Sequence, residues 1–134
     1  MIDLHIHSTA SDGTCTPSEI LDLVKKNKLR AFSITDHDSV DGVRELLKIG
    51  IPDQIDFVTG IEISASPPSL CASKGSMHIL GYGMDVENSE LDQTLRKLQI
   101  SRKNRNPKIV EKLNEIGIRV DLEDISRQDR KSVV

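Results

Sequence analysis

The sequence predicts an α/β protein that forms the N-terminal part of a βα barrel. Apolar patterns typical of strands and of helices alternate over the first hundred residues. Predicted strands start near residues 2, 30, 56 and 77, which gives a βα repeat of the length seen in barrels. A helical pattern follows at 88–116. We therefore expect the first half of a barrel at 1–87 and a helical insert at 88–128.

The first strand and the first helix have clear local signals. In the segment 2–7, isoleucine and leucine alternate with aspartate and histidine, which is the period of a strand. We expect the apolar side to pack against helices and the polar side to face the barrel mouth. Thr16 can cap the next helix, Pro17 suits its first position and Glu19 completes a capping box. The apolar face of that helix is predicted to contain Ile20, Leu21, Leu23 and Val24.

Three further strands and two further helices complete the pattern. A strand at 31–35 leads into Asp36-His37-Asp38, and Ser39 can cap the helix that follows. Further strands are expected at about 57–63 and at 77–82. The inward residues of the second helix are predicted to be Val43, Leu46, Leu47 and Ile49.

The helical pattern from residue 88 has its own internal and terminal signals. Pro107 should kink or divide this helix because proline lacks the amide donor that an interior position needs. Gly117 is a good C-terminal stop. The segment from Asp121 to Asp124 resembles the start of another short helix.

Composition narrows the class of protein and its location. The formal net charge of −3 gives no general case for binding nucleic acid or membrane. Cys15 and Cys71 form no metal or redox motif, so we read both as structural and expect no disulfide. With no targeting pattern and no long apolar run, the sequence predicts a cytoplasmic protein.

His5 and His7 are the first candidate metal ligands. Residues two apart on a strand point to the same side, so both imidazoles can reach one ion. Both lie at the C-terminal end of the first predicted strand, where βα barrels place their active sites. The alternative is that they are two ordinary surface histidines on an edge strand.

The neighbouring segments favour the metal interpretation. Asp12 lies in the loop after the first strand, His37 follows the second strand, and Glu62 lies at the end of the third. Three successive strands therefore bring candidate ligands to one rim, where Glu62 could bridge two ions. His78 completes the set, although it lies at the start of its strand and could be structural. Mixed imidazole and carboxylate ligands suit manganese, iron or zinc.

Other charged residues near these positions could support the site. Asp36 and Asp38 could orient His37, or could equally be solvated loop acids or a helix N-terminal charge. The segment 96–112 holds seven Lys or Arg against one acid. Arg102 and Arg105 are the best candidates in it for binding a substrate phosphate, the alternative being a solvated helix face.

These motifs resemble the PHP (polymerase and histidinol phosphatase) domain superfamily over about residues 2–125. Within it they are most similar to the stand-alone nucleoside 3′,5′-bisphosphate phosphatases and 5′-3′ exoribonucleases, which also have an arginine-rich helical insert. The resemblance implies a distorted βα barrel. The stretches that carry it are Asp3-Leu4-His5-Ile6-His7-Ser8 with Ser11-Asp12-Gly13, Ile34-Thr35-Asp36-His37-Asp38, Gly60-Ile61-Glu62-Ile63-Ser64 and His78-Ile79-Leu80-Gly81-Tyr82.

The resemblance also implies three divalent metal ions. His5, His7 and Glu62 would hold the first, Glu62 and His78 the second, and Asp12 and His37 the third. The family completes these sites with a later histidine and a C-terminal Asp-x-His, whereas this sequence has no histidine after His78. We therefore expect this chain to be an N-terminal fragment that is itself inactive.

The implied function is a metal-dependent phosphoesterase that hydrolyses phosphomonoesters of nucleotides or of short RNA 5′ ends through a metal-activated hydroxide. Its partners would be these phosphorylated substrates, with neither a membrane nor an obligate protein partner. Two alternatives stay open. One is a polymerase-associated PHP domain with a proofreading or structural role, and the other is a non-catalytic interaction module.

We interpret the last six residues as encoded by a sequencing adapter. Asp-Arg-Lys-Ser-Val-Val at 129–134 is the translation of the sequencing-adapter string GATCGGAAGAGCGTCGTGTAG, which ends in a stop codon. We expect these residues to be a non-native tail. The alternative is a genuine, charged C-terminus.

Overall fold

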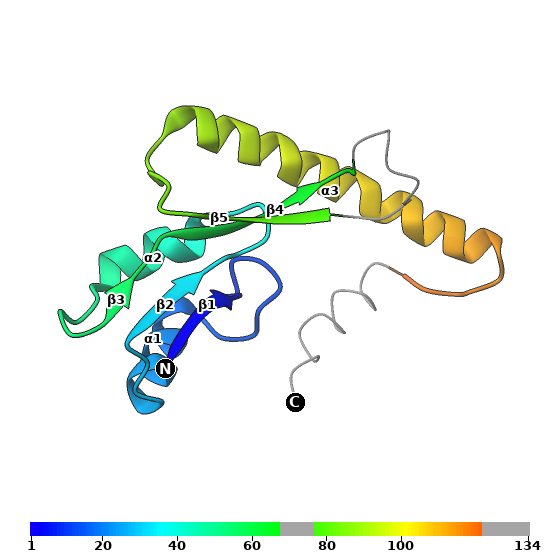
Figure 1. Cartoon of the computed structure of the whole chain (residues 1–134). Helices are drawn as coiled ribbons and strands as arrows, with labels where there is room; N and C mark the ends of the chain where they lie inside the picture. The colour runs from blue at the N-terminus through cyan, green and yellow to red at the C-terminus, as the bar shows by residue number, and fades with distance from the viewer. Residues whose placement is uncertain (68–76, 122–134) are drawn as a thin grey trace.

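The computed structural model describes residues 1–67 and 77–121, which form two small sheets and the helices around them (Figure 1). Cys71, the tail at 129–134 and the short helix expected after Asp121 lie outside the described residues. In chain order the elements are β1 (Ile2–Ile6), α1 (Pro17–Lys26), β2 (Ala31–Ile34), α2 (Asp41–Ile49), β3 (Asp56–Phe57), β4 (Gly60–Ala65), β5 (Met77–Tyr82) and α3 (Ser89–Glu115).

The strands form a parallel sheet in the order β1-β2-β3 and an antiparallel pair of β4 with β5. The fourth predicted strand is confirmed at Met77–Tyr82, but the expectation that it continues a parallel βα repeat is wrong. A parallel connection needs a crossover of about a dozen residues or more, usually a helix. The segment 66–76 is too short for one, and β5 instead returns beside β4.

The third predicted strand, 57–63, is divided into β3 and β4. The amide of Val58 still donates to the carbonyl of Phe32, and that of Glu62 donates to the carbonyl of Asp36. In both pairs the donor and the acceptor are separated by the same number of residues along the chain. The chain at the start of β4 therefore keeps the register that β3 has with β2. Glu62 therefore lies beside His37, with which it forms an isolated parallel bridge.

The first helix confirms its predicted start. The Thr16 side chain accepts from the Glu19 amide, the Glu19 carboxylate accepts from the Thr16 amide, and Pro17 opens the helix. Helix α1 packs against α2, and both contribute to one apolar core under β2. The buried core residues are Ile20, Leu21, Val24, Phe32, Ile34, Val40, Val43, Leu46, Ile55, Ile61, Val86 and Leu95.

Several predicted inward residues are exposed instead. Ile2 and Leu4 on β1 expose 62% and 39% of their surface. The pairing of this strand with β2 also shifts register between Asp3 and Ile6. Of the apolar side of this strand, only Ile6 packs against the core. The predicted inward residues Leu23 on α1 and Leu47 and Ile49 on α2 are also exposed. On each helix, the face that is buried in the core is narrower than the apolar face predicted from the sequence.

The second helix has its cap one residue after the predicted one, and the third begins where the helical pattern starts. In α2 the cap position is Val40, and the Ser39 hydroxyl one residue earlier accepts from the amide of Asp41 at 3.1 Å. In α3 the side chain of Asn88 accepts from the amides of Glu90 and Leu91 in the first turn of the helix.

Helix α3 crosses the molecule beside the β4–β5 pair and extends beyond it (Figure 1). Pro107 was expected to kink or divide this helix; division is wrong, because the helix runs as one element from Ser89 to Glu115. Gly117 follows its end with φ +90°, as the predicted stop requires. Leu91, Leu95 and Leu98 pack the first half of α3 onto the core. Within the described residues, no helix combines the length and apolarity that crossing a membrane would need.

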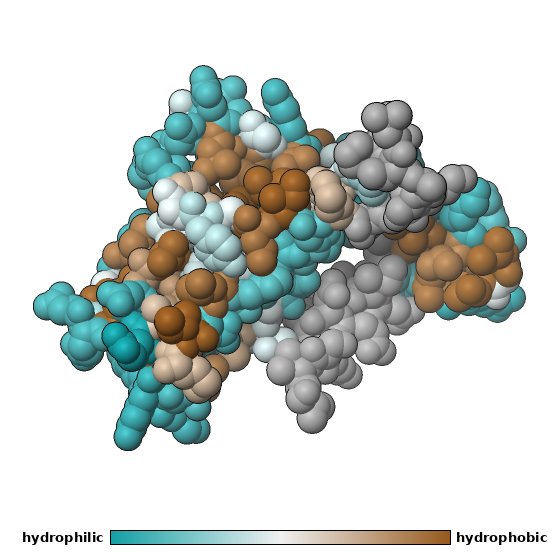
Figure 2. Space-filling view, in the orientation of Figure 1, coloured by the Kyte–Doolittle hydropathy of each residue, from teal (hydrophilic) through white to brown (hydrophobic). Residues whose placement is uncertain are grey.

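The face shown in Figure 2 has hydrophobic side chains over β1 and the β4–β5 pair. Exposed large apolar residues on these strands are Ile2, Leu4, Met77, Ile79, Leu80 and Tyr82. Beyond its packed half, α3 also exposes Ile109, and Ile116 and Ile118 follow it. The described part of the chain therefore leaves considerable apolar surface uncovered.

Candidate metal centre

The six side chains predicted as metal ligands come together at one end of the two sheets. His5 lies on β1, and His7 and Asp12 lie in the loop after it. His37 follows β2, while Glu62 and His78 lie on the adjacent strands β4 and β5. Three overlapping groups of these residues have ligand atoms within 4.8 Å of one another, namely His5, His7 and Glu62; His7, Asp12 and His37; and His37, Glu62 and His78.

Glu62 lies at the centre of the cluster and is 5% exposed. Its Oε2 is 2.8 Å from Nε2 of His5 and 2.9 Å from Nε2 of His7. Its Oε1 is 2.6 Å from Nδ1 of His78 and 3.9 Å from Nδ1 of His37. The two oxygens of one carboxylate therefore face different sets of imidazoles, which is the arrangement that a bridging ligand needs.

The antiparallel pairing of β4 with β5 explains the position of His78. His78 is near the start of β5, but it pairs with Ser64 near the C-terminal end of β4. Its side chain is therefore beside Glu62 at the same rim as the other histidines. The sequence signal that would have placed it was the short connection between the two strands.

Asp12 and His37 form the other side of the cluster. Oδ1 of Asp12 is 2.7 Å from Nδ1 of His7, and its Oδ2 is 3.5 Å from Nε2 of His37. The loop reaches this position through Gly13, where an added Cβ would lie 2.1 Å from the carbonyl oxygen of His7. Only glycine allows so close an approach of two backbone segments.

The environment sets the charge of these groups. Burial raises the pKa of Glu62, but its hydrogen bond with His5 and the charge of His37 more than offset this, so the pKa lies below its usual value. Burial likewise raises the pKa of Asp12, and the hydrogen bond with His7 leads the interactions that bring it below normal. Burial lowers the pKa of His37 against the opposing effect of Asp12 and Glu62. Charged carboxylates beside a neutral His37 near pH 7 are the protonation states that a metal requires.

The residues present suit a divalent metal on two observations. Nδ1 of His37 is buried and has no hydrogen-bond partner among the described residues, although burying such an atom unpaired is costly. Nε2 of His5 and Nε2 of His7 are 3.1 Å apart, and both lie beside the same oxygen of Glu62. Ligand atoms at about 2.1 Å from one ion would be about 3.0–3.4 Å apart, close to this spacing.

Asp36 and Asp38 are buried rather than solvated, and neither has a contact with the His37 side chain among the described interactions. Asp36 accepts hydrogen bonds from Ser8 and Ser11 in the loop after β1. The expectation that it orients His37 is therefore replaced by a contact with the loop that holds His7 and Asp12. Both serines belong to the motif that resembles the family, but nothing in their local pattern predicted their contact with Asp36.

Asp38 connects the cluster to α3. It is 1% exposed, and its φ of 52° lies in the left-handed region. Its carboxylate accepts from the Ser64 amide at 2.8 Å and lies 3.6 Å from Nε of Arg102. Its carbonyl oxygen accepts from the side chain of Gln99 at 2.9 Å. One residue beside His37 therefore ties the helix to the strand that holds Glu62.

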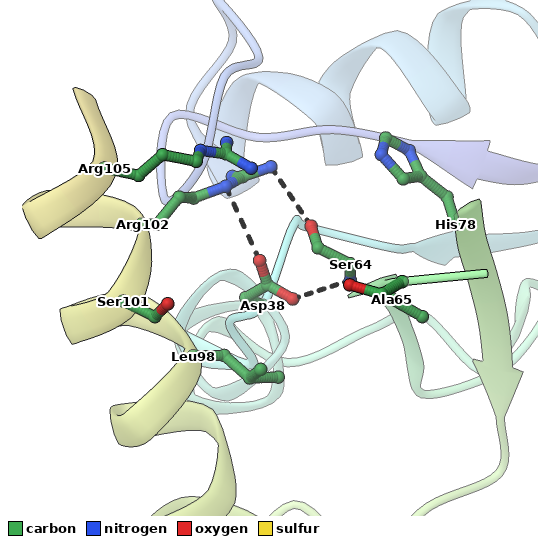
Figure 3. A pocket seen from close by; sticks show the side chains of 9 residues that line it. Asp38, Ser64, Ala65, His78, Leu98, Ser101, Arg102 and Arg105 are labelled. Carbon is green, nitrogen blue, oxygen red and sulfur yellow. Dashed lines mark hydrogen bonds and ion pairs between the residues drawn. The ribbon is translucent and has the colours of Figure 1, made fainter. Parts of the chain in front are cut away.

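A cavity of about 570 Å³ opens between α3 and the cluster (Figure 3). Arg102 and Arg105 reach into it from the helix, and His78 lies across from them. Arg102 also donates to the Ser64 hydroxyl at 3.3 Å. The two arginines predicted to bind phosphate thus lie near the candidate metal ligands.

Comparisons with known proteins agree with this geometry. The PHP domain family matches residues 3–118. The 3′,5′-nucleoside bisphosphate phosphatase of Chromobacterium violaceum is 32% identical over 117 residues, covering 87% of this chain and 39% of that protein. The 5′-3′ exoribonuclease of Haemophilus influenzae is 31% identical over 116 residues, covering 87% of this chain and 40% of that protein. This chain thus spans about two fifths of the length of these relatives.

Two solved structures share the fold. An amidohydrolase from Chromobacterium violaceum superimposes with a TM-score of 0.74 at 30% identity, covering 96% of this chain and 47% of that one. A protein from Bifidobacterium adolescentis superimposes with a TM-score of 0.77 at 24% identity, covering 98% of this chain and 44% of that one. With the family pattern matched over most of its length, and the motif residues gathered at one rim, this chain belongs to the PHP domain family.

Proposed function

We propose that this protein is a metal-dependent phosphoesterase that hydrolyses phosphomonoesters of nucleotides or of short RNA 5′ ends. The observation that supports this most is the position of Glu62, whose two carboxylate oxygens face different imidazoles at 2.6–2.9 Å. Clusters of this kind suit two or more divalent ions held close together. The names of the relatives, a nucleoside bisphosphate phosphatase and an exoribonuclease, agree with such chemistry.

Six residues would hold the ions, which we propose to be three in number and to be manganese, iron or zinc. His5, His7 and Glu62 would hold the first, Glu62 and His78 the second, and Asp12 and His37 the third. The geometry of the cluster supports this division, because the ligand atoms of each pair or triplet lie within 4.8 Å of one another. Imidazole with carboxylate is the ligand chemistry that these metals accept.

Divalent ions, when bound, would activate water near neutral pH and offset the negative charge of the phosphoryl group. The protein contributes the position and charge of the ligands. Glu62 is held in register beside His37 by backbone hydrogen bonds on both sides, from its amide to the Asp36 carbonyl and from the Asp38 amide to its own carbonyl. The lowered pKa values of Glu62 and Asp12 keep both carboxylates charged for binding.

Arg102 and Arg105 would bind a further phosphate of the substrate. Both line the cavity that His78 also lines, so a nucleotide with two phosphates could contact the arginines and the cluster together. Ser64 and Asp38 hold Arg102 from one side, which leaves part of its guanidinium group toward the cavity. Arginine suits this role because its fork of donors matches phosphate oxygens.

Phosphate release from adenosine 3′,5′-bisphosphate in the presence of Mn²⁺ tests the proposal. Because the chain spans 39% of the Chromobacterium phosphatase, it is assayed alone and joined to the remaining part of that relative. We expect background release from the chain alone and release by the joined protein that falls at least about 100-fold with His5→Ala or Glu62→Ala.

A joined protein that is folded and loaded with Mn²⁺ but releases no phosphate from any nucleotide monoester would contradict the proposed activity. The matched control is Glu115→Ala, which removes a carboxylate at the far end of α3 and should leave the rate unchanged. Release by the chain alone that depends on His5 would show that these six residues suffice.

A further inference from the structure

Asp36 is a fully buried carboxylate that accepts three hydrogen bonds from one loop. Its Oδ1 accepts from the Ser8 amide at 2.7 Å and from the Ser11 hydroxyl at 2.7 Å. Its Oδ2 accepts from the Ser8 hydroxyl at 2.6 Å. A charge buried this deeply is tolerated only when such donors satisfy it. The conformation of the loop therefore depends on the Asp36 carboxylate, and the burial of that carboxylate depends on the donors of the loop.

The two serines adjoin two of the candidate ligands. Ser8 directly follows His7, and Ser11 directly precedes Asp12. Between them the loop closes on itself, because the amides of Ser11 and Gly13 both donate to the carbonyl of Ser8. Fixing the serines consequently fixes where the imidazole of His7 and the carboxylate of Asp12 can lie.

Asp36 is itself fixed from two other directions. Its carbonyl oxygen accepts from the Glu62 amide at 3.1 Å, and its chain neighbour is His37. Helix α2 closes over its carboxylate at Gly42, where an added Cβ would lie 2.3 Å from Oδ2 of Asp36 and 2.5 Å from Oγ of Ser8. A single side chain thus links the loop after β1 to the segments that hold His37 and Glu62.

We propose that Asp36 is a positioning residue of the metal centre, which sets the positions of His7 and Asp12 through Ser8 and Ser11. This rests on the proposed function insofar as those residues bind metal. Asp36 is not one of the proposed ligands, because both of its oxygens accept hydrogen bonds from the loop. Its effect is on the affinity of the site and on the geometry of its ligands.

Mn²⁺ binding by the 134-residue chain, measured by calorimetry, tests this role. Asp36→Asn keeps the shape of the side chain but removes its charge and one acceptor, and Ser11→Ala removes one donor at the partly exposed end of the network. Losing a residue that supports metal ligands weakens metal binding by about 10- to 100-fold, and we expect Asp36→Asn to fall in this range. Adding Ser11→Ala to Asp36→Asn should weaken binding further, because the remaining asparagine oxygen can still accept from the Ser8 amide and the Ser11 hydroxyl.

The matched control is Ser33→Ala, another fully buried serine, on β2, whose hydroxyl makes only a 3.5 Å contact with the neighbouring carbonyl. It should bind Mn²⁺ within about twofold of the unaltered chain. Thermal melting with a chelator shows which variants are folded at the assay temperature. Visible absorption at saturating Co²⁺ adds a measure of ligand geometry, which should change in Asp36→Asn and not in Ser33→Ala.

The outcomes separate this inference from the proposed function. If the unaltered chain binds Mn²⁺ and the folded Asp36→Asn and Ser11→Ala variants bind it equally well, with unaltered Co²⁺ spectra, the positioning role is wrong. If Asp36→Asn does not fold, the Mn²⁺ affinity of Ser11→Ala is the test. A folded Ser11→Ala variant that binds Mn²⁺ as tightly as the unaltered chain then overturns the positioning role. An unaltered chain that binds neither Mn²⁺ nor Co²⁺ would overturn the metal centre itself, and the positioning role with it.

Discussion

Oε1 of Glu62 lies 2.6 Å from Nδ1 of His78, although the two residues are on strands that run in opposite directions. The pairing places the beginning of β5 beside the later part of β4, so both side chains reach the rim where His5, His7 and His37 also lie. Glu62 therefore has contacts with histidines from two different sheets.

Substituting Glu62 should affect metal binding more than substituting a single histidine. We expect Glu62→Ala to abolish measurable Mn²⁺ or Zn²⁺ binding in calorimetry and His5→Ala to reduce affinity, because both oxygens of Glu62 lie within 2.9 Å of imidazole nitrogens from three histidines. Removing metal with a chelator should lower the Tm of the unaltered chain, since a ligand that binds only the folded state stabilises it. A Glu62→Ala, His5→Ala double variant that binds as well as the original would show that the cluster is not the site.

Arg105 and Arg102 should differ in their effects. Arg102 contacts Asp38 and Ser64, whereas no ion pair is found for Arg105 within the described residues. We expect Arg105→Gln to weaken binding of adenosine 3′,5′-bisphosphate by about 10- to 100-fold with an unchanged Tm, as loss of a charged hydrogen bond implies. Arg102→Gln should weaken binding and also lower the Tm. Lys103→Gln removes the same charge from an exposed position of the helix and is the control; an equal loss in it would point to general electrostatic attraction.

Gly42→Ala should destabilise the protein, although alanine is normally the better helix former. Its Cβ would lie 2.3 Å from Oδ2 of Asp36, inside contact distance of a buried group that cannot easily move. We expect a loss of about 1–3 kcal/mol in the free energy of unfolding, measured by urea denaturation. The substitution Leu47→Ala on the exposed side of the same helix should cost much less. A stabilised Gly42→Ala protein would mean that α2 is not packed on Asp36 as described.

The ion pair between Arg44 and Asp92 should make stability depend on pH in the acid range. The hydrogen bond from Arg44 is the largest effect that lowers the pKa of Asp92 below its usual value. Because the folded pKa is depressed, this contribution is fully present above the unfolded pKa of Asp, about 3.9, and is lost as pH falls through the folded value. Asp92→Asn should therefore lower the Tm at pH 7 and lose that difference toward pH 2–3. A difference that is constant from pH 7 to pH 2 would rule out the ionic contribution.

The chain should self-associate when purified alone. Ile2 and Leu4 on β1 are exposed, and within the described residues β1 pairs only with β2, which leaves one strand edge open. Open edges beside apolar side chains promote association between chains. Size-exclusion chromatography should show species larger than a monomer, and Ile2→Lys should reduce them. A monomer with a sharp thermal transition would show instead that these residues form an independent domain.

The sequence by itself determined the local elements and indicated which residues are candidate metal ligands. The capping box at Thr16 and Glu19, the strand at 77–82 and the helix from Asn88 depend on interactions between residues close in the chain, so their patterns are readable without a fold. The two-residue spacing of His5 and His7 likewise predicted that their imidazoles converge, and their Nε2 atoms are 3.1 Å apart although His7 lies just beyond the end of β1.

The tertiary structure decided what depends on contacts between distant segments. Local pattern could not show the register shift in β1, the exposure of Ile2 and Leu4, or the hydrogen bonds of Asp36 with Ser8 and Ser11. Each is settled by pairing register and by hydrogen bonds across many residues. A buried carboxylate accepts whichever donors the fold brings to it, and the sequence around Asp36 does not name them.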